Sequence, residues 1–506
     1  MSDASLPGAH GQSAAFRPVA APACCQRPAR ALATEPAAER DPLPIAVIGA
    51  GPVGLAAAAH LARRGLSFLV LEQGPDAGRA LRAWGHVRVF SPWRYNLDSA
   101  ATALLGETGW QAPDAEALPT GAEIVRDYLQ PLAAHPAIAP HVRYGAQVMR
   151  VLREGFDKVT TPGRAAAPFL LRWRDAEGSA HSARARAVLD ASGTWFSPNP
   201  MGVSGEAVPG EEEAGACIQH GIPDVLGARR ADYAGRRVLV VGSGHSAMNV
   251  VLDLLRLQEA EPRTRIAWAM RRDRTAQLAG GGLNDQLPAR GALGLAARKA
   301  LQSGRLDVLV PFAAERIEST GEGLHVAAHC GGRPVDFHVD RIVVATGFRP
   351  DWSALRELRV AADPVLESPP ALAPLIDPNV HSCGTVPPPG VAELAQPERG
   401  FYIVGSKSYG RAPTFLMATG YEQVRSVVAD LAGDHEAARA VHLVLPETGV
   451  CGAGLAAGQT GGADSAADTE SACCGGPAPA GVDACCAQDA EARSGGAAGC
   501  GCGEVR

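Results

Sequence analysis

Apolar residues near the start of the chain form two short runs on either side of an alanine- and leucine-rich segment. The runs Ile45–Ile48 and Phe68–Leu71 have the length of buried strands. The segment between them, Leu55–Arg64, has the composition of a helix. This order of elements predicts a βαβ unit with two parallel strands.

The same pattern of apolar residues recurs in the middle of the chain. Val238–Val241 has strand length, Val250–Leu257 has helical composition, and Ile266–Met270 is a second apolar run. Self-similarity of this kind indicates an internal repeat of one supersecondary unit. The sequence therefore predicts two βαβ units.

The second half of the chain adds two more strands and a helix to this pattern. Arg341–Pro350 and Phe401–Gly405 are apolar segments that end in glycine-containing turns. Ala412–Leu431 has helical spacing, and we expect this helix to begin near Pro413 and Thr414, because proline is favoured in the first helical turn. The alternation of strands with helices predicts the α/β fold class.

The region between the two units contains a different kind of pattern. Ala122–Leu132 has helical spacing, and its proline at position 131 predicts that the helix ends there. Val142–Val151, Phe169–Trp173 and Ala185–Leu189 predict strands of a small meander. We expect this meander to lead the chain back to the first unit.

Glycines follow the first strand in the spacing G-x-G-x-x-G. Gly49 permits a tight turn, Gly51 lets the backbone approach a pyrophosphate, and Gly54 allows the helix to pack closely on the strand. Pro52 lies between these glycines, and the N-terminus of the helix that follows offers peptide N–H groups to phosphate oxygens. Glu72 ends the second strand, 23 residues after Gly49, where an acid accepts hydrogen bonds from a ribose. The pattern predicts a site for the ADP half of a dinucleotide; the alternative is a buried βαβ unit with incidental glycines.

The second unit carries a related turn, G-x-G-x-x-A. Gly242, Gly244 and Ala247 occupy its three positions, and His245 and Ser246 lie between them. By the same reasoning, these five residues are candidates for binding a second dinucleotide.

The residue that ends the second strand differs between the two units. Arg271, followed by Arg272, stands where the first unit has Glu72. An acid at this position suits a free ribose 2′-hydroxyl, whereas arginine accommodates a 2′-phosphate. The second site is therefore predicted to bind NADPH in preference to NADH. The alternative is a solvated strand end, where arginines are common.

Aromatic residues are concentrated in the segment Arg82–Asp98. Trp84, Phe90, Trp93 and Tyr95 lie within 12 residues of each other. One interpretation is a packed loop beneath a long insertion. The other is a wall against a flat cofactor ring, with Trp84 in contact with the cofactor, because such rings stack on aromatic surfaces.

Composition and charge limit the classes of function that remain. The chain has 506 residues, 46% hydrophobic and 20% charged, which is typical of a globular protein of two or three domains. Its net charge of −6 argues against a general nucleic-acid partner. No apolar run is long enough to predict a membrane span, and no secretory signal is evident at the N-terminus.

The twelve cysteines are distributed unevenly along the chain. Seven follow Pro446, two are Cys24 and Cys25, and only Cys217, Cys330 and Cys383 fall in the segment expected to fold. A disulfide scaffold would not concentrate its cysteines at the termini, so we expect a cytoplasmic protein.

Both ends of the chain have compositions typical of disordered segments. Residues 1–42 are rich in alanine, proline and glycine, and residues 446–506 contain no aromatic residue and carry 2 arginines against 8 acids, a charge of −6. The second segment also contains three close thiol pairs: Cys473 and Cys474, Cys485 and Cys486, and Cys500 and Cys502. Such pairs suit a soft metal or metalloid ion, and they lack the spacing of a zinc ribbon. The alternative is drift in a low-complexity tail.

Two dinucleotide units in one chain, the first ending in an acid and the second in arginine, resemble the two-domain FAD/NAD(P)H flavoproteins. The resemblance spans about Leu43–Gly433, and within this superfamily the chain is most similar to the class B flavin-containing monooxygenases. The turns Ala191–Gly193 and Ala345–Gly347 also match. The resemblance implies FAD at the first turn, NADPH at the second, and cofactor contacts from Thr346 and Gly347.

The resemblance also implies a domain plan of the glutathione-reductase-like kind, in which the NAD(P)H-binding domain is inserted into the FAD-binding domain. The expected limits are a disordered arm over 1–42, FAD-binding parts over 43–204 and 347–445, an NADPH-binding domain over 205–346, and the cysteine-rich tail over 446–506.

His220 lies in the segment Gly205–Gly235, which we expect to be a loop. The monooxygenases that the chain resembles carry F-x-G-x-x-x-H-x-x-x-W/Y here. This chain keeps the histidine and lacks the phenylalanine, the correctly spaced glycine and the closing aromatic residue. His220 is the candidate catalytic residue, to orient the cofactor or move a proton, and the alternative is a structural histidine.

Three functions follow from these observations. The first is an NADPH-dependent FAD monooxygenase acting on a small molecule with O2. The second is a flavoprotein reductase that passes electrons to thiols or a metalloid through the tail, although no C-x-x-C or C-x-x-x-x-C lies beside either glycine turn. The third is a non-enzymatic metal- or metalloid-binding protein on a flavoprotein scaffold.

Overall fold

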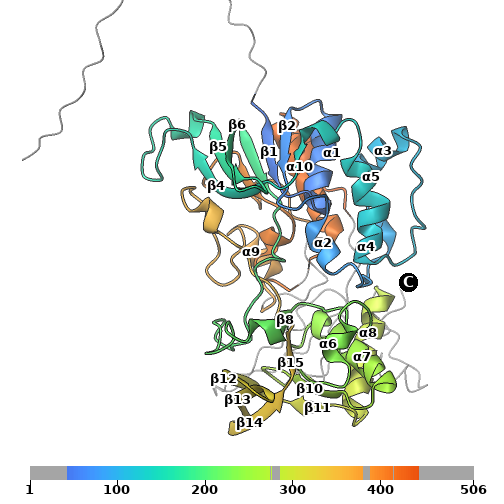
Figure 1. Cartoon of the computed structure of the whole chain (residues 1–506). Coiled ribbons are helices and arrows are strands. Elements are labelled where there is room, and N and C mark those ends of the chain that lie inside the picture. The colour runs from blue at the N-terminus through green and yellow to red at the C-terminus, as the bar shows by residue number, and fades with distance from the viewer. Residues whose placement is uncertain are drawn as a thin grey trace, which may run out of the picture. The chain divides into compact units, whose positions relative to one another are not determined.

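The fold is described from a computed structural model of the chain (Figure 1). The structure describes residues 43–443, except for 274, 276, 277, 279–284, 286, 380–387 and 414. The predicted arm over 1–42, the tail with its thiol pairs, Cys383 and Thr414 lie outside the described residues. Among the described residues, no helix is long and apolar enough to cross a membrane.

The first sheet contains five parallel strands in the order β16-β7-β1-β2-β3. Its strands are β1 (Ile45–Ile48), β2 (Phe68–Leu71), β3 (Val142–Arg143), β7 (Ala187–Asp190) and β16 (Phe401–Ile403). The chain reaches β2 and β3 on one side of β1, and β7 and β16 on the other. The order reverses between β1 and β7, and ligands of open α/β sheets bind at such a reversal, at the carboxyl ends of the strands.

Helices beside this sheet bury its apolar residues. Figure 1 shows α1 (Pro52–Arg63) next to α10 (Met417–Leu431), and the two helices contact each other, as do α1 and α3 (Ser99–Glu107). Ala56–Ala59 of α1 are fully buried and allow this close packing on two sides. The short helices α2 (Arg79–Ala83) and α11 (His435–Arg439) complete this part of the fold.

The second sheet repeats the topology of the first in four of its five strands. It also has five parallel strands, in the order β11-β10-β9-β15-β8, and the order reverses between β9 and β15. Its strands are β8 (Ile218–His220), β9 (Arg237–Val241), β10 (Arg265–Ala269), β11 (Asp307–Leu309) and β15 (Arg341–Val344). The edge strand beside β15 comes first in the chain, whereas the corresponding strand of the first sheet, β16, comes last. The helices α6 (Arg230–Tyr233), α7 (His245–Ala260) and α8 (Pro288–Gln302) accompany it. The internal repeat that the sequence predicts is therefore present in the structure.

Two antiparallel meanders accompany the parallel sheets. The first contains β4 (Gln147–Arg153), β5 (Phe169–Arg174) and β6 (Ala180–Ala185). The second contains β12 (Phe312–Thr320), β13 (Gly323–Cys330) and β14 (Arg333–Val339). The sequence predicted the first meander without β6 and did not predict the second.

Three predicted elements have different limits in the structure. The helix expected to end at Pro131 runs to Ala133, as α4 (Gly121–Ile124), a π-helical turn over Val125–Leu129 and α5 (Gln130–Ala133). A π turn relaxes the hydrogen-bond ladder just before the proline, which lacks the N–H that a regular helix would use. Helix α10 begins at Met417 rather than near Pro413. The predicted loop over Gly205–Gly235 contains β8, which pairs with β15.

The chain passes from the first sheet toward the second near Asn199 and returns near Gly347, and these two crossings lie side by side. Asn199 donates its backbone N–H to the carbonyl oxygen of Gly347 at 2.9 Å, and Pro198 forms a bridge with Phe348. Thr346 donates its hydroxyl to the carbonyl oxygen of Asn199 at 2.9 Å. The two crossings are thus joined by hydrogen bonds. The limits predicted for the inserted domain, 205 and 346, stay predictions.

A buried carboxylate joins the first meander to the loop before β16. Glu398 accepts hydrogen bonds from Arg153 Nε at 2.8 Å and Arg164 Nη2 at 2.7 Å, and all three side chains are 3% exposed. The amide of Arg359 donates to the same carboxylate at 3.0 Å. Burial alone would raise the pKa of Glu398, but these hydrogen bonds outweigh burial and lower it.

Glu398→Ala is expected to destabilise the protein by about 3–5 kcal/mol, because it leaves two buried guanidinium groups without their carboxylate. Chemical denaturation at neutral pH measures this change. Because the pKa of Glu398 is lowered by folding, its contribution is present above the pKa of the unfolded state and disappears as the pH falls through the folded value. An Ala variant that unfolds at the same denaturant concentration as the wild type would contradict the assignment.

Candidate functional site

The first glycine turn lies at the carboxyl end of β1, where the order of the first sheet reverses. Gly49 has φ +101°, and a β-carbon there would lie 2.8 Å from the carbonyl oxygen of Ala191. A β-carbon at Gly54 would overlap the carbonyl oxygen of Gly49. Both positions therefore require glycine so that the turn, the helix and β7 can pack together.

Gly51 differs from Gly49 and Gly54, the other two glycines of the turn. Its backbone has φ −78°, which any residue adopts, and a β-carbon there would meet no atom within 4 Å. The missing side chain leaves open space directly over the backbone at the start of α1, where Pro52 is the first helical residue. Peptide N–H groups at a helix start attract phosphate oxygens, so these residues fit the pyrophosphate of a dinucleotide such as FAD.

Glu72 lies against the same turn. Its carboxylate accepts the backbone N–H of Ala50 at 2.6 Å and that of Gly74 at 2.6 Å, and the residue is 5% exposed. The two amides fix the orientation of the carboxylate. Each carboxylate oxygen has a second acceptor position, which suits the hydroxyls of a ribose placed at the end of β2.

The second turn repeats the geometry of the first. Gly242 has φ +138°, and a β-carbon there would overlap the carbonyl oxygen of Ala345, the counterpart of Ala191. Gly244 has φ −82° and open space around the β-carbon position, as Gly51 has. Ala247 is fully buried on α7, at the position of Gly54. The residues present therefore fit a second dinucleotide.

His245 and Ser246 are the first two residues of α7. The centroid of the His245 ring lies 5.4 Å from that of the Phe90 ring. The guanidinium of Arg290 lies over the same Phe90 ring, at 5.9 Å from its centroid. Burial lowers the pKa of His245, and the nearby Arg290 lowers it further. A neutral imidazole therefore stands at the start of the helix, beside the aromatic segment Arg82–Asp98.

The two arginines that follow β10 are exposed. Arg271 donates to the carbonyl oxygen of Val203 at 3.4 Å. Their position at the carboxyl end of the strand next to β9 is on the same edge as the turn at Gly242. Binding of a nucleotide 2′-phosphate by these arginines stays a prediction.

Aromatic side chains gather near the two chain crossings. The ring centroids of Trp84 and Trp195 are 6.4 Å apart, and those of Trp195 and Phe348 are 4.7 Å apart. Arg79 lies over the ring of Phe196 at 4.5 Å. Trp84 also packs so tightly on Gly121 that a β-carbon there would lie 2.8 Å from its ring. Trp84 thus has a packing role, and its contact with a cofactor stays a prediction.

His220 ends β8, next to Val344 of β15. Its Nδ1 is buried and has no hydrogen-bond partner among the described residues. Burial lowers the pKa of His220, so the ring is neutral at neutral pH. A neutral ring with an unused nitrogen can accept or donate one proton, which is what the predicted role requires.

Thr346 and Gly347 take part in the crossing described above. Thr346 uses its hydroxyl, and Gly347 uses its carbonyl oxygen, to hold the opposite strand. Gly347 has φ +93°, which explains the glycine. The structure therefore gives both residues a role at the crossing, and their contact with a cofactor stays a prediction.

Sequence reasoning did not identify Asp190 and Lys407, which form a buried ion pair beside the first turn. Lys407 Nζ lies 2.7 Å from Asp190 Oδ2 and 3.2 Å from Ser192 Oγ. The only local signal was a charged residue at the end of an otherwise apolar strand, the aspartate of Ala187–Asp190.

The described residues contain two free cysteines, Cys217 and Cys330, and no group of three or more histidine, cysteine or acidic residues that could hold a metal. The six thiols of the predicted metal site lie outside the described residues. Metal binding by the tail therefore rests on the sequence alone.

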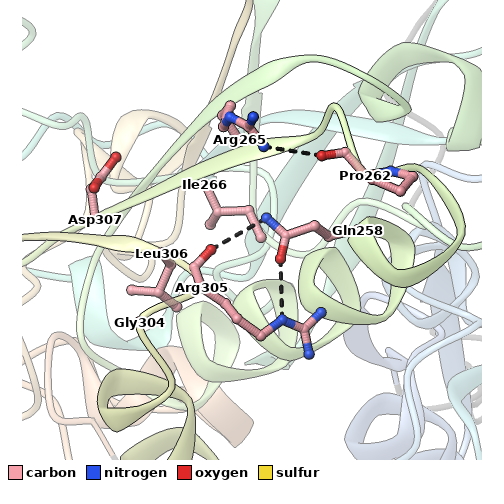
Figure 2. A pocket seen from close by; sticks show the side chains of 8 residues that line it. All are labelled: Gln258, Pro262, Arg265, Ile266, Gly304, Arg305, Leu306 and Asp307. Carbon is pink, nitrogen blue, oxygen red and sulfur yellow. Dashed lines mark hydrogen bonds between the residues drawn. The ribbon is translucent and has the colours of Figure 1, made fainter.

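A cavity of about 580 Å³ lies beside the second sheet (Figure 2). It is lined by Arg265, the first residue of β10, and Asp307, the first residue of β11. Figure 2 shows Gln258 between the backbone and the guanidinium of Arg305, with hydrogen bonds of 3.2 Å to each. The amino ends of the strands form this cavity, so it lies at the opposite edge from Gly242 and is not the dinucleotide site.

Comparison with known proteins decides the family. A model of the pyridine nucleotide-disulphide oxidoreductase family matches residues 43–367, which is more than half of the chain and includes both glycine turns. The chain belongs to the pyridine nucleotide-disulphide oxidoreductase family. The family is one of oxidoreductases that use a pyridine nucleotide, and its fold is the two-domain flavoprotein fold that the sequence predicts. The identity of the two cofactors as FAD and NADPH stays part of the proposal below.

Two relatives by sequence differ in activity. The chain is 28% identical to a ferredoxin–NADP reductase of Thermus thermophilus over 280 residues, which are 55% of this chain and 64% of that protein. It is 30% identical to the indole-3-pyruvate monooxygenase YUCCA1 of Oryza sativa subsp. japonica over 216 residues, 42% of this chain and 44% of that protein. The chain thus spans less than two thirds of either relative.

Among solved structures, the bacillithiol disulfide reductase Bdr of Bacillus cereus has a similar fold. It matches 77% of this chain and 99% of its own, with a TM-score of 0.56 and 18% sequence identity. At this identity the likeness concerns the fold alone.

Proposed function

We propose that the protein is a monooxygenase that uses NADPH and O2 to oxidise a small molecule in the cytoplasm. The observation that carries the proposal is the pair of open glycine turns, at Gly51 and Gly244, with no cysteine pair beside either among the described residues. Similarity to YUCCA1, which is named as a monooxygenase, supports the same reaction class.

Each turn has a defined task in this proposal. Gly51 and the start of α1 hold the pyrophosphate of FAD, and Glu72 holds its ribose. Gly244 and the start of α7 hold the pyrophosphate of NADPH, and Arg271 and Arg272 bind its 2′-phosphate. When bound, FAD supplies the chemistry of accepting a hydride and reacting with O2.

His220 has a separate task, which its chemistry suggests. Its imidazole is neutral, and its Nδ1 has no partner among the described residues. It accepts or returns a proton during oxygen transfer, while Trp195, close to Gly221, shields the site from water.

Oxygen consumption tests the proposed reaction. Purified protein with FAD is mixed with NADPH in air and under argon, while nicotinamide absorbance and dissolved oxygen are followed. We expect one O2 consumed for each NADPH oxidised in air, and no sustained turnover under argon. Sustained anaerobic oxidation of NADPH with a disulfide or a metalloid as acceptor would instead support a reductase.

The reductase is the second candidate function, and the three thiol pairs of the tail favour it. In that case the tail carries electrons from the flavin to thiols or to a metalloid. The fold shared with a bacillithiol disulfide reductase is compatible with this reaction. Because the family is one of oxidoreductases, ion binding by the tail alone would be an additional property rather than the whole function.

Removing the residues after Pro446 is expected to leave FAD content and NADPH oxidation unchanged and to abolish arsenite binding. Six thiols in one short segment can supply the roughly three thiolates that a trivalent metalloid prefers. Titration of full-length and truncated protein with arsenite under reducing conditions measures the difference. Affinity should fall at low pH, because ligation requires thiolates.

A full-length variant with serine at all six positions is the matched control. It keeps the length and charge of the tail and also keeps Cys451. Equal arsenite binding by the wild type and this variant would show that the thiol pairs are not ligands. Loss of NADPH oxidation on truncation would place the tail in the electron path.

A further inference from the structure

Asp190 and Lys407 occupy the point of the first sheet where the glycine turn lies. Asp190 is the last residue of β7, opposite Ile48 of β1 on one side and Ile403 of β16 on the other. Lys407 belongs to the 3-10 turn Gly405–Tyr409, which directly follows β16. The pair therefore links the ends of adjacent strands at the reversal of strand order.

The two charges are removed from water and face each other. The Lys407 side chain is 5% exposed and the Asp190 side chain is 2% exposed, and Lys407 Nζ lies 2.7 Å from Asp190 Oδ2. The backbone N–H of Ser192 donates to Asp190 Oδ1 at 3.1 Å, and the Ser192 hydroxyl lies 3.2 Å from Lys407 Nζ. Nζ also lies 5.9 Å from the ring of Trp352. Each charge is thus compensated chiefly by the other in a medium of low polarity.

The backbone around the pair borders the first glycine turn. The carbonyl oxygen of Ala191 lies over Gly49, and a β-carbon at Gly193 would lie 3.5 Å from Ser406 Oγ. A β-carbon at Gly405 would lie 3.3 Å from the side chain of Val53 in α1. The ion pair therefore fixes two backbone segments that form the side of the turn opposite Glu72.

Helix α10 holds the same 3-10 turn from its other side. Gln423 accepts the backbone N–H of Gly405 at 2.7 Å and donates to the hydroxyl of Ser408 at 2.8 Å. Both side chains are fully buried. The turn is thus held between the ion pair and α10, and loss of the pair would release one of its two attachments.

We propose that Asp190 and Lys407 are positioning residues for bound FAD, and that their mutual neutralisation keeps either charge alone from shifting the reduction potential of the cofactor. The proposal rests on FAD binding and is independent of the reaction with O2. Reduction adds negative charge at the cofactor, so an uncompensated ammonium nearby favours the reduced state and an uncompensated carboxylate disfavours it. With both charges present, the two effects oppose each other.

A double-mutant cycle tests the proposal. It compares the wild type with Asp190→Asn, Lys407→Met and the variant that carries both substitutions. The midpoint potential of bound FAD is measured anaerobically against reference dyes, without substrate. We expect the potential to rise in Asp190→Asn, to fall in Lys407→Met and to return close to the wild-type value in the double variant. A purely structural role would not shift the two single variants in opposite directions.

The dissociation constant of FAD, measured by flavin fluorescence, gives the second readout. We expect both single variants to bind FAD at least tenfold more weakly and the double variant to recover most of this loss, because removing one partner of a buried pair is worse than removing both. Glu398→Gln is the matched control: it breaks another buried ion pair of the same part of the fold and should leave the midpoint potential unchanged.

Ser192→Ala provides a milder variant if a single charge removal prevents folding. It withdraws the hydroxyl next to Lys407 Nζ and should raise the potential by less than Asp190→Asn does. Midpoint potentials equal to that of the wild type in Ser192→Ala and in the foldable single variants, with full FAD occupancy, would overturn the proposal. Shifts of the same sign in Asp190→Asn and Lys407→Met would also overturn it.

Discussion

Gly51→Val is expected to produce a folded protein that purifies without FAD. The backbone at Gly51 has φ −78°, so valine introduces no strain, and its β-carbon would meet no protein atom within 4 Å. The added side chain would instead fill the space over the backbone that a pyrophosphate must approach. Flavin absorbance per polypeptide measures the loss, and circular dichroism and thermal unfolding establish that the fold persists.

The second turn offers a matched control for this substitution. Gly244 has φ −82° and the same open surroundings, so Gly244→Val should retain FAD and lose reduction of the flavin by NADPH. Gly54→Ala provides the contrast, because its β-carbon would overlap the carbonyl oxygen of Gly49 and destabilise the unit itself. A folded Gly51→Val protein with stoichiometric FAD would show that the first turn is not the FAD site.

Arg271→Ala is expected to raise the KM for NADPH by roughly ten- to a hundredfold, since a charge-assisted hydrogen bond to a phosphate contributes about 1.5–3 kcal/mol. The KM for NADH should change little, because NADH has no 2′-phosphate. Arg271 is exposed at the carboxyl edge of the second sheet, and its guanidinium donates a long hydrogen bond of 3.4 Å to the carbonyl oxygen of Val203. Initial rates with both nucleotides measure the effect.

Arg265→Ala is the control, because it removes an exposed positive charge far from the predicted phosphate site. Arg265 is also exposed. It is the first residue of β10, the strand that precedes Arg271, and therefore lies at the amino edge of the sheet. Its removal should leave both KM values unchanged. If Arg271→Ala weakened both nucleotides equally, the arginine would support the strand end and would not recognise the phosphate.

The βαβ units could be predicted because their signals are local. The strands Ile45–Ile48 and Phe68–Leu71 have the predicted limits, and the second unit begins within one residue of its prediction, at Arg237. A glycine turn between an apolar strand and a helix specifies both elements from a few adjacent residues. The two sheets then follow, since parallel strands joined by helices have few alternative topologies.

The elements that were missed depend on contacts between distant residues. Ile218–His220 is a strand because β15, far along the chain, offers it a partner, and nothing in its acidic surroundings marks it. The second meander, β12–β14, contains polar residues on its outer face, which weaken its strand pattern. Its two short turns, Gly321-Glu322 and Gly331-Gly332, are nevertheless local hairpin signals that could have predicted it. Strand preference is weak in such segments, and pairing decides the outcome.

The two buried ion pairs described above could not be predicted either, because each joins residues that are far apart in the sequence. Asp190 and Lys407 are 217 residues apart in sequence, and Arg153 and Glu398 are 245 apart. Each residue alone reads as an ordinary charged residue, which is normally exposed. Only the packed structure shows that they are buried and that each compensates its partner.

The paired crossings at Asn199 and Gly347 have a consequence for how such a protein could arise and be rebuilt. A chain that leaves the first sheet and returns to it at adjacent positions can carry any amount of structure between them without rerouting a strand. The first sheet keeps its strand order whether the excursion is long or short. We therefore expect that exchanging the segment between these two crossings for that of a relative changes the nucleotide preference and retains FAD binding.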